Sequence, residues 1–414
     1  MKFDEFLERA YTPYQAVELA REFLQKHGFC ALSEEETWHL KAGGKYYVIR
    51  GGCSILAFTV GKNPKDGRIK VVASHLDSPC LKLKYHPEHG SAGYTVLNTE
   101  VYGGAILYSF FDRPLKIAGR IVTAQDGALQ SVPYVSPFAV VLPSLAVHMN
   151  RGVNEGFAPN MQTELPLLAI GEGKLPLENA VAYDLFAVPA EVPFVSGLNN
   201  EFFSSPRIDN LTSVCASLSA LCNGKNESGI CIAACFDSEE IGSGTRQGAG
   251  SDFLEATVRR IHFALSLTEE EALKAYASSF LISFDNAHAV HPNHPEKADP
   301  TNRPVLGGGV VVKSHANGAY TTDALSFAAV TQIMEHAKAK YQTFYNRSDM
   351  RSGATLGRIA LEKLGFLSAD LGLAQLAMHS AVETFASADY EEAEKALTAF
   401  YQADIHITSD GVRF

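Results

Sequence analysis

Two adjacent glutamates, Glu239 and Glu240, follow the unbroken apolar run that extends from Gly229 to Phe236. The run predicts a buried strand, and carboxylates at its end would sit on a rigid support at the carboxyl edge of a sheet, where open α/β folds bind ligands. Because successive side chains leave an extended backbone in opposite directions, one glutamate could hold a metal ion while the other handles a proton. Taken alone, the pair is more simply explained as a solvated acidic turn.

A histidine and two aspartates stand at the ends of other expected elements. The run Ile69 to Ser74 predicts a strand that leads into His75, and Asp77 lies two positions further on the same side of an extended chain. A metal-binding histidine commonly has a carboxylate on its second ring nitrogen, a position that suits Asp77, although an ordinary hydrogen-bonded histidine is the simpler explanation. Asp209 directly precedes a helical stretch, where a helix cap is the simpler role.

Two further groups complete the set. Asp285 follows the expected strand Phe280 to Phe284, and the segment after it carries three histidines among prolines that exclude regular structure. His379 and Glu383 have the i, i+4 spacing of an ordinary pair on a helix surface. Together, these residues could fill two metal sites that share one carboxylate, with another carboxylate left for acid–base work. Imidazole and carboxylate ligands without thiolates suit Zn²⁺, Mn²⁺ or Co²⁺.

The elements that must position these groups alternate between strand and helix, which predicts an α/β fold with a mostly parallel sheet flanked by helices. A helix is expected after Thr12-Pro13, and short strands are expected at residues 46–50, 55–60 and 69–74. After residue 205, strands are expected at 230–236 and 280–284, and helices at 211–221, 252–261, 323–341, 353–364 and 390–404.

Residues 85–205 have a different composition, in which prolines, glycines and runs of β-branched or aromatic residues dominate. Examples are the runs 119–123, 139–143 and 183–194. No long helical period occurs there, which predicts an inserted β-rich domain. The catalytic domain would then be discontinuous and consist of residues 1–84 and 206–414.

Composition excludes several classes of protein. With 414 residues, 46% of them hydrophobic and 20% charged, the chain has ample material for a packed core. The formal net charge of −11 argues against nucleic-acid binding, which needs clustered basic residues. No apolar run is long enough for a membrane helix, and the first residues do not resemble a signal peptide. Seven cysteines without a Cys-x-x-Cys pair predict reduced thiols in a cytoplasmic protein.

Several segments resemble the M18 family of metallopeptidases, the aspartyl aminopeptidases, which belong to the clan with two co-catalytic zinc ions. The Ser-His-x-Asp-Ser-Pro and Ala-His-Ala-Val-His-Pro-Asn strings are specific to this family, and the family-like texture extends to about residue 385. The matching segments are Ser74-His-Leu-Asp-Ser-Pro-Cys80, Arg207-Ile-Asp-Asn-Leu211, Ser238-Glu-Glu-Ile-Gly-Ser243, Asp285-Asn-Ala-His-Ala-Val-His-Pro-Asn293 and Met378-His-Ser380.

The resemblance implies two divalent metal ions in each subunit, zinc first and manganese or cobalt as alternatives. In that assignment Asp209 bridges the ions. His75 and Asp285 complete one site, while Glu240 and His379 complete the other.

The same resemblance assigns the remaining catalytic roles. Glu239 would act as the general base and acid, and Asp77 would orient His75. A cis peptide bond would join Asp209 to Asn210. The implied reaction is the release of one N-terminal amino acid, Asp or Glu, from a peptide with a free N-terminus.

Substrate recognition and assembly follow from the resemblance as well. The positions of His288 and Lys313 are associated with substrate binding in the family, and Arg351 is a further cationic candidate chosen for its residue type. His148 corresponds to a histidine that reaches the active site of a neighbouring subunit. The implied assembly is a homo-oligomer in which dimers build a tetrahedral dodecamer.

Two alternatives remain open from the sequence. One is a metal-dependent deacylase that acts on N-acyl amino acids with the same dinuclear core. In deacylase and carboxypeptidase relatives the extra domain is inserted later in the chain, whereas here it lies between Asp77 and Asp209, which favours the aminopeptidase. The other is a non-catalytic assembly protein, which the retention of Glu239 argues against.

Overall fold

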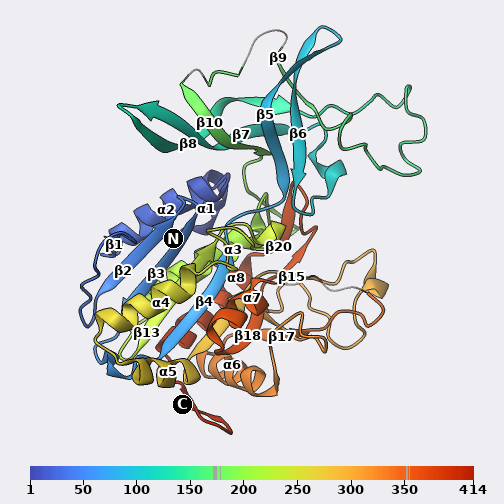
Figure 1. The fold of residues 1–414 in the computed structure, drawn as a ribbon. Coiled ribbons are helices and arrows are strands. Elements are labelled where there is room, and N and C mark those ends of the chain that lie inside the picture. Colours follow the sequence, from blue (N-terminus) through green and yellow to red (C-terminus); the bar gives the residue numbers. More distant parts are fainter. Residues whose placement is uncertain (171–174, 178, 351–352, 354) are drawn as a thin grey trace.

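A nine-stranded sheet forms the centre of the molecule in the computed structural model, which describes residues 1–414 except 171–174, 178, 351–352 and 354 (Figure 1). The strand order is β1-β2-β3-β13-β4-β14-β18-β16-β17, and the central strands β13, β4, β14 and β18 are parallel. The strands are β1 (Cys30–Leu32), β2 (Lys45–Arg50), β3 (Ser54–Val60), β4 (Ile69–His75), β13 (Ile230–Phe236), β14 (Phe280–Phe284), β16 (Val310–Lys313), β17 (Tyr341–Phe344) and β18 (Leu367–Gly372).

Helices cover both faces of this sheet. The first face packs against α1 (Phe3–Arg9), α2 (Pro13–Lys26), α3 (Ile208–Asn223), α6 (Ala324–Ala337) and α8 (Ser387–Gln402). The second face packs against α4 (Phe253–Ala264) and α7 (Leu356–Leu364), and α5 (Glu269–Ala277) borders it. Among the helices of the described residues, none combines the length and apolar character needed to cross a membrane.

Strand β13 shows why its sequence is continuously apolar. Cys231, Ala233 and Cys235 belong to the core on the first face, while Ile232 and Phe236 belong to the core on the second. Successive side chains of a strand point to opposite faces, so a strand covered on both sides needs apolar residues at every position. The apolar run ends at Phe236, and the first polar residue after it, Asp237, lies at the carboxyl edge of the sheet.

A closed six-stranded barrel lies beside one end of the sheet and joins its strands in the order β10-β5-β6-β9-β8-β7 (Figure 1). Its interior is filled by leucine, isoleucine and valine side chains. The strands are β5 (Cys80–Ser91), β6 (Tyr94–Tyr102), β7 (Pro114–Gln125), β8 (Ala128–Val141), β9 (Leu167–Ile170) and β10 (Ala180–Pro189).

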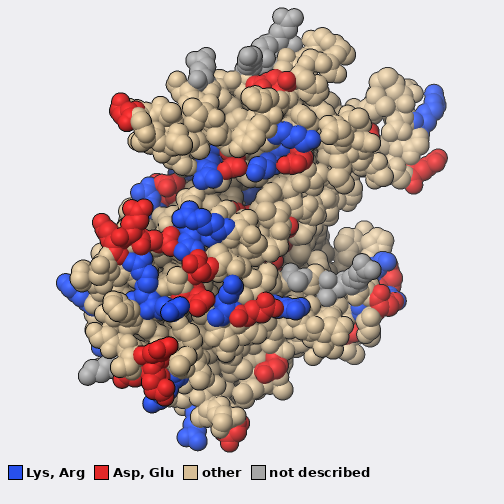
Figure 2. All heavy atoms as spheres, in the orientation of Figure 1, with Lys and Arg blue, Asp and Glu red and all other residues tan. Residues whose placement is uncertain are grey.

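Charged side chains connect the barrel to the body that contains the large sheet. On the face drawn in Figure 2, acidic and basic residues alternate, and several of them meet where the barrel approaches that body. Arg120 of β7 pairs with Asp184 of β10 at 2.9 Å and donates a hydrogen bond to the carbonyl oxygen of Gly51 in the body.

A second, five-stranded sheet and several short elements complete the fold. The second sheet has the order β11-β12-β20-β19-β15 and joins segments that are far apart in the sequence. Its strands are β11 (Phe194–Ser196), β12 (Phe202–Ser205), β15 (Ala287–His288), β19 (Ala374–Leu376) and β20 (Glu383–Ala386). The remaining elements are the hairpin β21 (His406–Ile407) and β22 (Val412–Arg413), and the 3₁₀ turns η1 (Pro64–Asp66), η2 (Leu107–Phe110), η3 (Glu239–Ile241) and η4 (Pro295–Lys297).

The helix expected at residues 323–341 is present but shorter than predicted. The helix α6 ends at Ala337, because Lys338 adopts a left-handed conformation (φ 55°) that closes the last turn. The chain then returns to the sheet, and Tyr341–Phe344 pairs with β16 as strand β17. The expected run 183–194 is likewise divided, since β10 ends at Pro189 and Phe194 begins β11.

The close approach of β18 to the end of β14 generates a prediction. A Cβ atom at Gly372 would lie 1.6 Å from the backbone oxygen of Asp285, so Gly372→Ala must displace that backbone. We expect the free energy of unfolding to fall by about 1–3 kcal/mol, the range for overpacked sites, as measured by urea denaturation. Gly90→Ala is the control, because no atom lies within 4 Å of its added Cβ. Equal stability of the two variants would contradict the prediction.

Candidate metal centre

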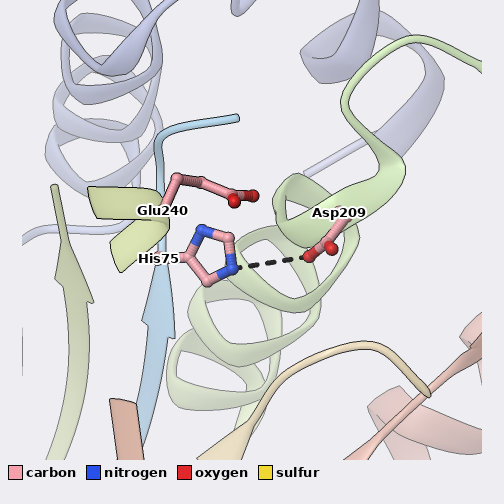
Figure 3. A group of neighbouring side chains, drawn as sticks. All are labelled: His75, Asp209 and Glu240. Carbon is pink, nitrogen blue, oxygen red and sulfur yellow. Dashed lines mark ion pairs between the residues drawn. The ribbon is translucent and has the colours of Figure 1, made fainter. Parts of the chain in front are cut away.

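The five residues expected to be metal ligands lie together at the carboxyl edge of the large sheet. His75 ends β4, Asp285 follows β14, and Glu240 lies in η3 directly after β13. Asp209 lies near the start of α3, and His379 lies in the turn between β19 and β20. Because the central strands are parallel, their carboxyl ends meet at one edge, where α/β folds place ligands. Figure 3 shows His75, Asp209 and Glu240 pointing toward one another.

The carboxylate of Asp209 lies between two imidazoles. Its Oδ1 is 3.4 Å from Nε2 of His75, and its Oδ2 is 3.6 Å from Nε2 of His379. Each imidazole also faces a second carboxylate: Asp285 Oδ1 is 3.4 Å from His75, and Glu240 Oε1 is 3.5 Å from His379. The result is two groups of three ligating side chains that share Asp209.

This donor set fits zinc. Donor atoms bound about 2.0–2.1 Å from one tetrahedral ion lie roughly 3.4 Å apart, close to the separations observed here. Asp209 Oδ1 and Glu240 Oε1 are buried, and neither has a hydrogen-bond partner among the described residues. A buried carboxylate oxygen without a partner is costly, and a cation between these groups would remove that cost. Ligand atoms of His75, Asp209 and Glu240 all lie within 4.8 Å of one another.

Both histidines are held so that Nε2 faces the carboxylates. Nδ1 of His75 lies 3.0 Å from the carbonyl oxygen of Asp77, and Nδ1 of His379 lies 3.1 Å from that of Gly104. A carbonyl oxygen can only accept a hydrogen bond, so each Nδ1 must carry the proton. Each Nε2 is then left with a lone pair for a metal ion.

Asp77 supports both sides of the centre. Its carboxylate accepts hydrogen bonds from the backbone N–H groups of Glu239 (3.0 Å) and Glu240 (3.1 Å) and from the hydroxyl of Tyr102 (2.8 Å). It also lies 3.5 Å from Nδ1 of His75. Asp77 therefore contacts His75, as expected, and additionally fixes the turn that carries the two glutamates, which the sequence did not indicate.

Glu383 is the main residue that the sequence analysis missed. It begins β20, and His379 lies in a turn with φ 69°, so the two do not form a helix-surface pair. Its buried carboxylate accepts hydrogen bonds from the backbone N–H of His379 (2.6 Å), the backbone N–H of Asp209 (2.9 Å) and the side chain of Gln375 (3.3 Å). Glu383 thus positions two candidate ligands through their backbones. The only signal in the sequence was a carboxylate four residues after His379.

The backbone at Asp209 has an unusual conformation. Asp209 lies within α3 but has non-helical dihedral angles (φ −78°, ψ 110°), and its peptide bond to Asn210 is cis, as the family resemblance implied. The helix-cap explanation is wrong, because the capping position belongs to Arg207 and the carboxylate of Asp209 faces the two histidines.

Glu239 lies in the same cluster but takes no part in the two groups of ligands. Among the described residues, no hydrogen bond or ion pair involves its carboxylate. Burial raises its pKa, with His75 opposing the shift and Asp285 adding to it. A carboxyl group that is near the ligands, unpaired and readily protonated is suited to proton transfer.

Lys313 is placed beneath Asp285. The side chain is 1% exposed, and its Nζ donates hydrogen bonds to the backbone oxygens of Asp285 (3.0 Å) and Asn286 (3.3 Å). Burial alone would raise the pKa of the Asp285 carboxyl, but Lys313 and His75 together lower it below its ordinary value. Lys313 therefore keeps Asp285 ionised.

The other expected substrate-binding residues do not lie together. His288 is exposed in β15, three residues after Asp285. His148 is exposed in the long segment between β8 and β9, and no contact among the described residues brings it to the centre. Arg351 lies outside the described residues.

The arrangement around Glu383 generates a prediction. Glu383→Gln replaces one acceptor oxygen by an NH₂ group that would face a backbone N–H donor, so we expect loss of about 1–3 kcal/mol in stability and weaker zinc binding. Zinc affinity by competition with a chromophoric chelator and unfolding by urea measure these effects. Glu270→Gln, on the exposed side of α5, is the matched control. Unchanged zinc affinity in Glu383→Gln would contradict a positioning role.

Comparisons with known proteins identify the family of the chain. The family model described as "Aminopeptidase I zinc metalloprotease (M18)" matches residues 6–176 and 170–401. The chain is 39% identical to the Clostridium acetobutylicum protein named "Probable M18 family aminopeptidase 2", covering 97% of this chain and 98% of that protein.

Solved structures of related proteins superpose on this chain over nearly its whole length. A chain in the cryo-EM structure of the Ape4 and Nbr1 complex superposes with a TM-score of 0.92 at 33% identity, covering 97% of this chain and 84% of that chain. The structure of the S. cerevesiae mApe1 dodecamer superposes with a TM-score of 0.84 at 27% identity, covering 97% and 95%. The sequence, the fold and the donor set at the edge of the sheet agree, and the chain belongs to the M18 family of zinc metallo-aminopeptidases.

Proposed function

We propose that this aminopeptidase uses two zinc ions to remove single N-terminal residues, preferably Asp or Glu, from peptides. The observation that carries the proposal is the position of Asp209, whose two carboxylate oxygens each face a different histidine. One ion would be held by His75, Asp209 and Asp285, and the other by His379, Asp209 and Glu240. Manganese or cobalt could take the same ligands.

Bound zinc ions would lower the pKa of a water molecule and polarise the scissile carbonyl group. The residues of the chain supply the rest of the chemistry. Glu239 takes the proton of the attacking water and then delivers it to the leaving amine. Asp77 holds Glu239 at the correct place by accepting the hydrogen bond from its backbone N–H. Glu383 fixes the backbones of Asp209 and His379, so the ligands are already oriented before substrate arrives.

Cleavage would be restricted to the N-terminal residue because the carboxylates around the ions would bind the substrate's free amino group. Preference for an acidic side chain would come from fixed donors next to Asp285. His288 is exposed there. Lys313 supplies positive charge from below, and two of its three N–H donors are already used by backbone oxygens. Arg351 stays a candidate from the sequence.

We further propose that residues 85–205 form an oligomerisation domain inserted into the catalytic domain of residues 1–84 and 206–414. The segment after β8 carries exposed apolar side chains around His148, including Leu145, Val147 and Met149. Such side chains on a protruding segment favour contact with another subunit. The related mApe1 is a dodecamer, and a dodecamer of this chain would bring His148 to a neighbouring active site.

A panel of substrates tests the function. Aminoacyl amides of Asp, Glu, Leu and Lys, together with N-acetyl-Asp and N-acetyl-Glu peptides, are compared by kcat/KM on zinc-loaded enzyme. We expect the highest kcat/KM for the unblocked Asp and Glu substrates. We expect no cleavage of the blocked substrates, because the enzyme needs the free amino group. Glu239→Gln should lower kcat by about 10²–10⁴-fold without loss of zinc. Release from the blocked substrates alone would identify a deacylase instead.

Metal stoichiometry tests the shared ligand. We expect two zinc ions per native subunit by elemental mass spectrometry, one in Asp285→Asn and fewer than one in Asp209→Asn, because only Asp209 contributes to both groups. Removal of zinc by a chelator should abolish activity, and added zinc should restore it. Asp410→Asn, close to the C-terminus, is the control. One ion in the native protein would refute the dinuclear assignment.

A further inference from the structure

A cavity of about 310 Å³ opens beside the metal centre. Its walls come from the segment that follows β15, from the end of β17 and from the turn that follows β19 (Figure 1). Two of its lining residues adjoin the centre: His288 comes three residues after Asp285, and Ala377 comes two residues before His379. The cavity therefore begins where the centre ends, and its volume is at the lower end of the range of small-ligand sites.

The lining is basic. Among the described residues that line the cavity there is no aspartate or glutamate. The lining side chains that are cationic or can become so are His288, His291, His294, Lys297, Arg303 and Arg347. In a chain whose formal net charge is −11, the lining itself is a local reversal of sign, although Glu296 and Asp349 beside it pair with His294 and Arg347. Such a reversal beside a reaction centre favours an anionic ligand.

Two of these cations are available to a ligand. Arg347 is already paired with Asp349 at 2.7 Å, and His294 lies 3.4 Å from Glu296. Lys297 and Arg303 are exposed, and neither takes part in an ion pair among the described residues.

The base of the cavity is apolar. Phe344, Pro304 and Ala289 are buried and line it. A surface with an apolar base and cationic walls suits a peptide whose backbone and methylene groups lie against the base while its carboxylates reach the walls.

Resting on the function proposed above, we propose that this cavity binds the part of the peptide that follows the scissile bond and favours acidic side chains at its second and third residues. Lys313, the buried cation assigned to the first residue, is absent from the lining. The cavity is therefore separate from Lys313, the cation next to Asp285. Of Lys313 and His288, which are both expected to bind the first residue of the substrate, only His288 lines the cavity. Lys297 and Arg303 select for carboxylates downstream, independently of the first residue.

The experiment uses two peptides that differ only downstream, Asp-Glu-Glu-Ala and Asp-Gln-Gln-Ala, with zinc-loaded native enzyme. We expect kcat/KM to be about three- to ten-fold higher for the Glu peptide at low salt, mainly through KM, as two partly exposed ion pairs would give. The preference should decline as ionic strength rises, because salt screens exposed charges. The double variant Lys297→Gln, Arg303→Gln should reduce the preference to less than two-fold.

The control is Arg259→Gln on the exposed side of α4, with a side chain that is 73% exposed, which should keep the preference. Binding of both peptides to the Glu239→Gln protein, measured by calorimetry, gives the same comparison without turnover. Equal kcat/KM for the two peptides with native enzyme, or a preference that survives in the double variant, would overturn the inference while leaving the aminopeptidase function intact. Failure to cleave either peptide would instead remove the proposed function and the inference with it.

Discussion

Carboxylates that share a buried site repel one another, and the centre of this protein gathers Asp209, Glu239, Glu240 and Asp285 within one small volume. Burial raises the pKa values of Glu239 and Glu240, and the neighbouring acids raise them further. Folding such a group requires positive charge or donors from elsewhere. The site meets this requirement with two imidazoles, one buried ammonium group and carboxylates arranged to share a cation.

The scaffold meets this requirement with backbone groups and rigid strand ends. Asp77 and Glu383 belong to neither group of ligands, and their carboxylates accept hydrogen bonds from the backbone N–H groups of Glu239, Glu240, Asp209 and His379. Lys313 acts in the same way through the backbone oxygen of Asp285. Ligands from five separate segments are thereby fixed in relation to one another, which a site on flexible loops could not achieve.

Much of this centre could be predicted from the sequence, because His75, Glu240 and Asp285 come after apolar runs whose length and composition predict buried strands. The strands 230–236 and 280–284 have the predicted bounds, and the residues at their ends meet as expected. The supporting contacts could not be predicted. Glu383 and Asp209 are 174 residues apart, and Tyr102 reaches Asp77 from another sheet, so no local pattern links them. The strand β17 was missed because a left-handed residue ended α6 inside a sequence that favours helix.

The end of β6 connects the barrel to the residues of the metal centre. The hydroxyl of Tyr102 donates a hydrogen bond to Asp77, and two residues later the carbonyl oxygen of Gly104 accepts a hydrogen bond from Nδ1 of His379, so this short stretch contacts both groups of candidate ligands. The barrel is consequently not an exchangeable module. Any mechanical load that an assembly places on it would be transmitted to the reacting groups, and a chain from which it had been deleted would keep its ligands but lose their alignment.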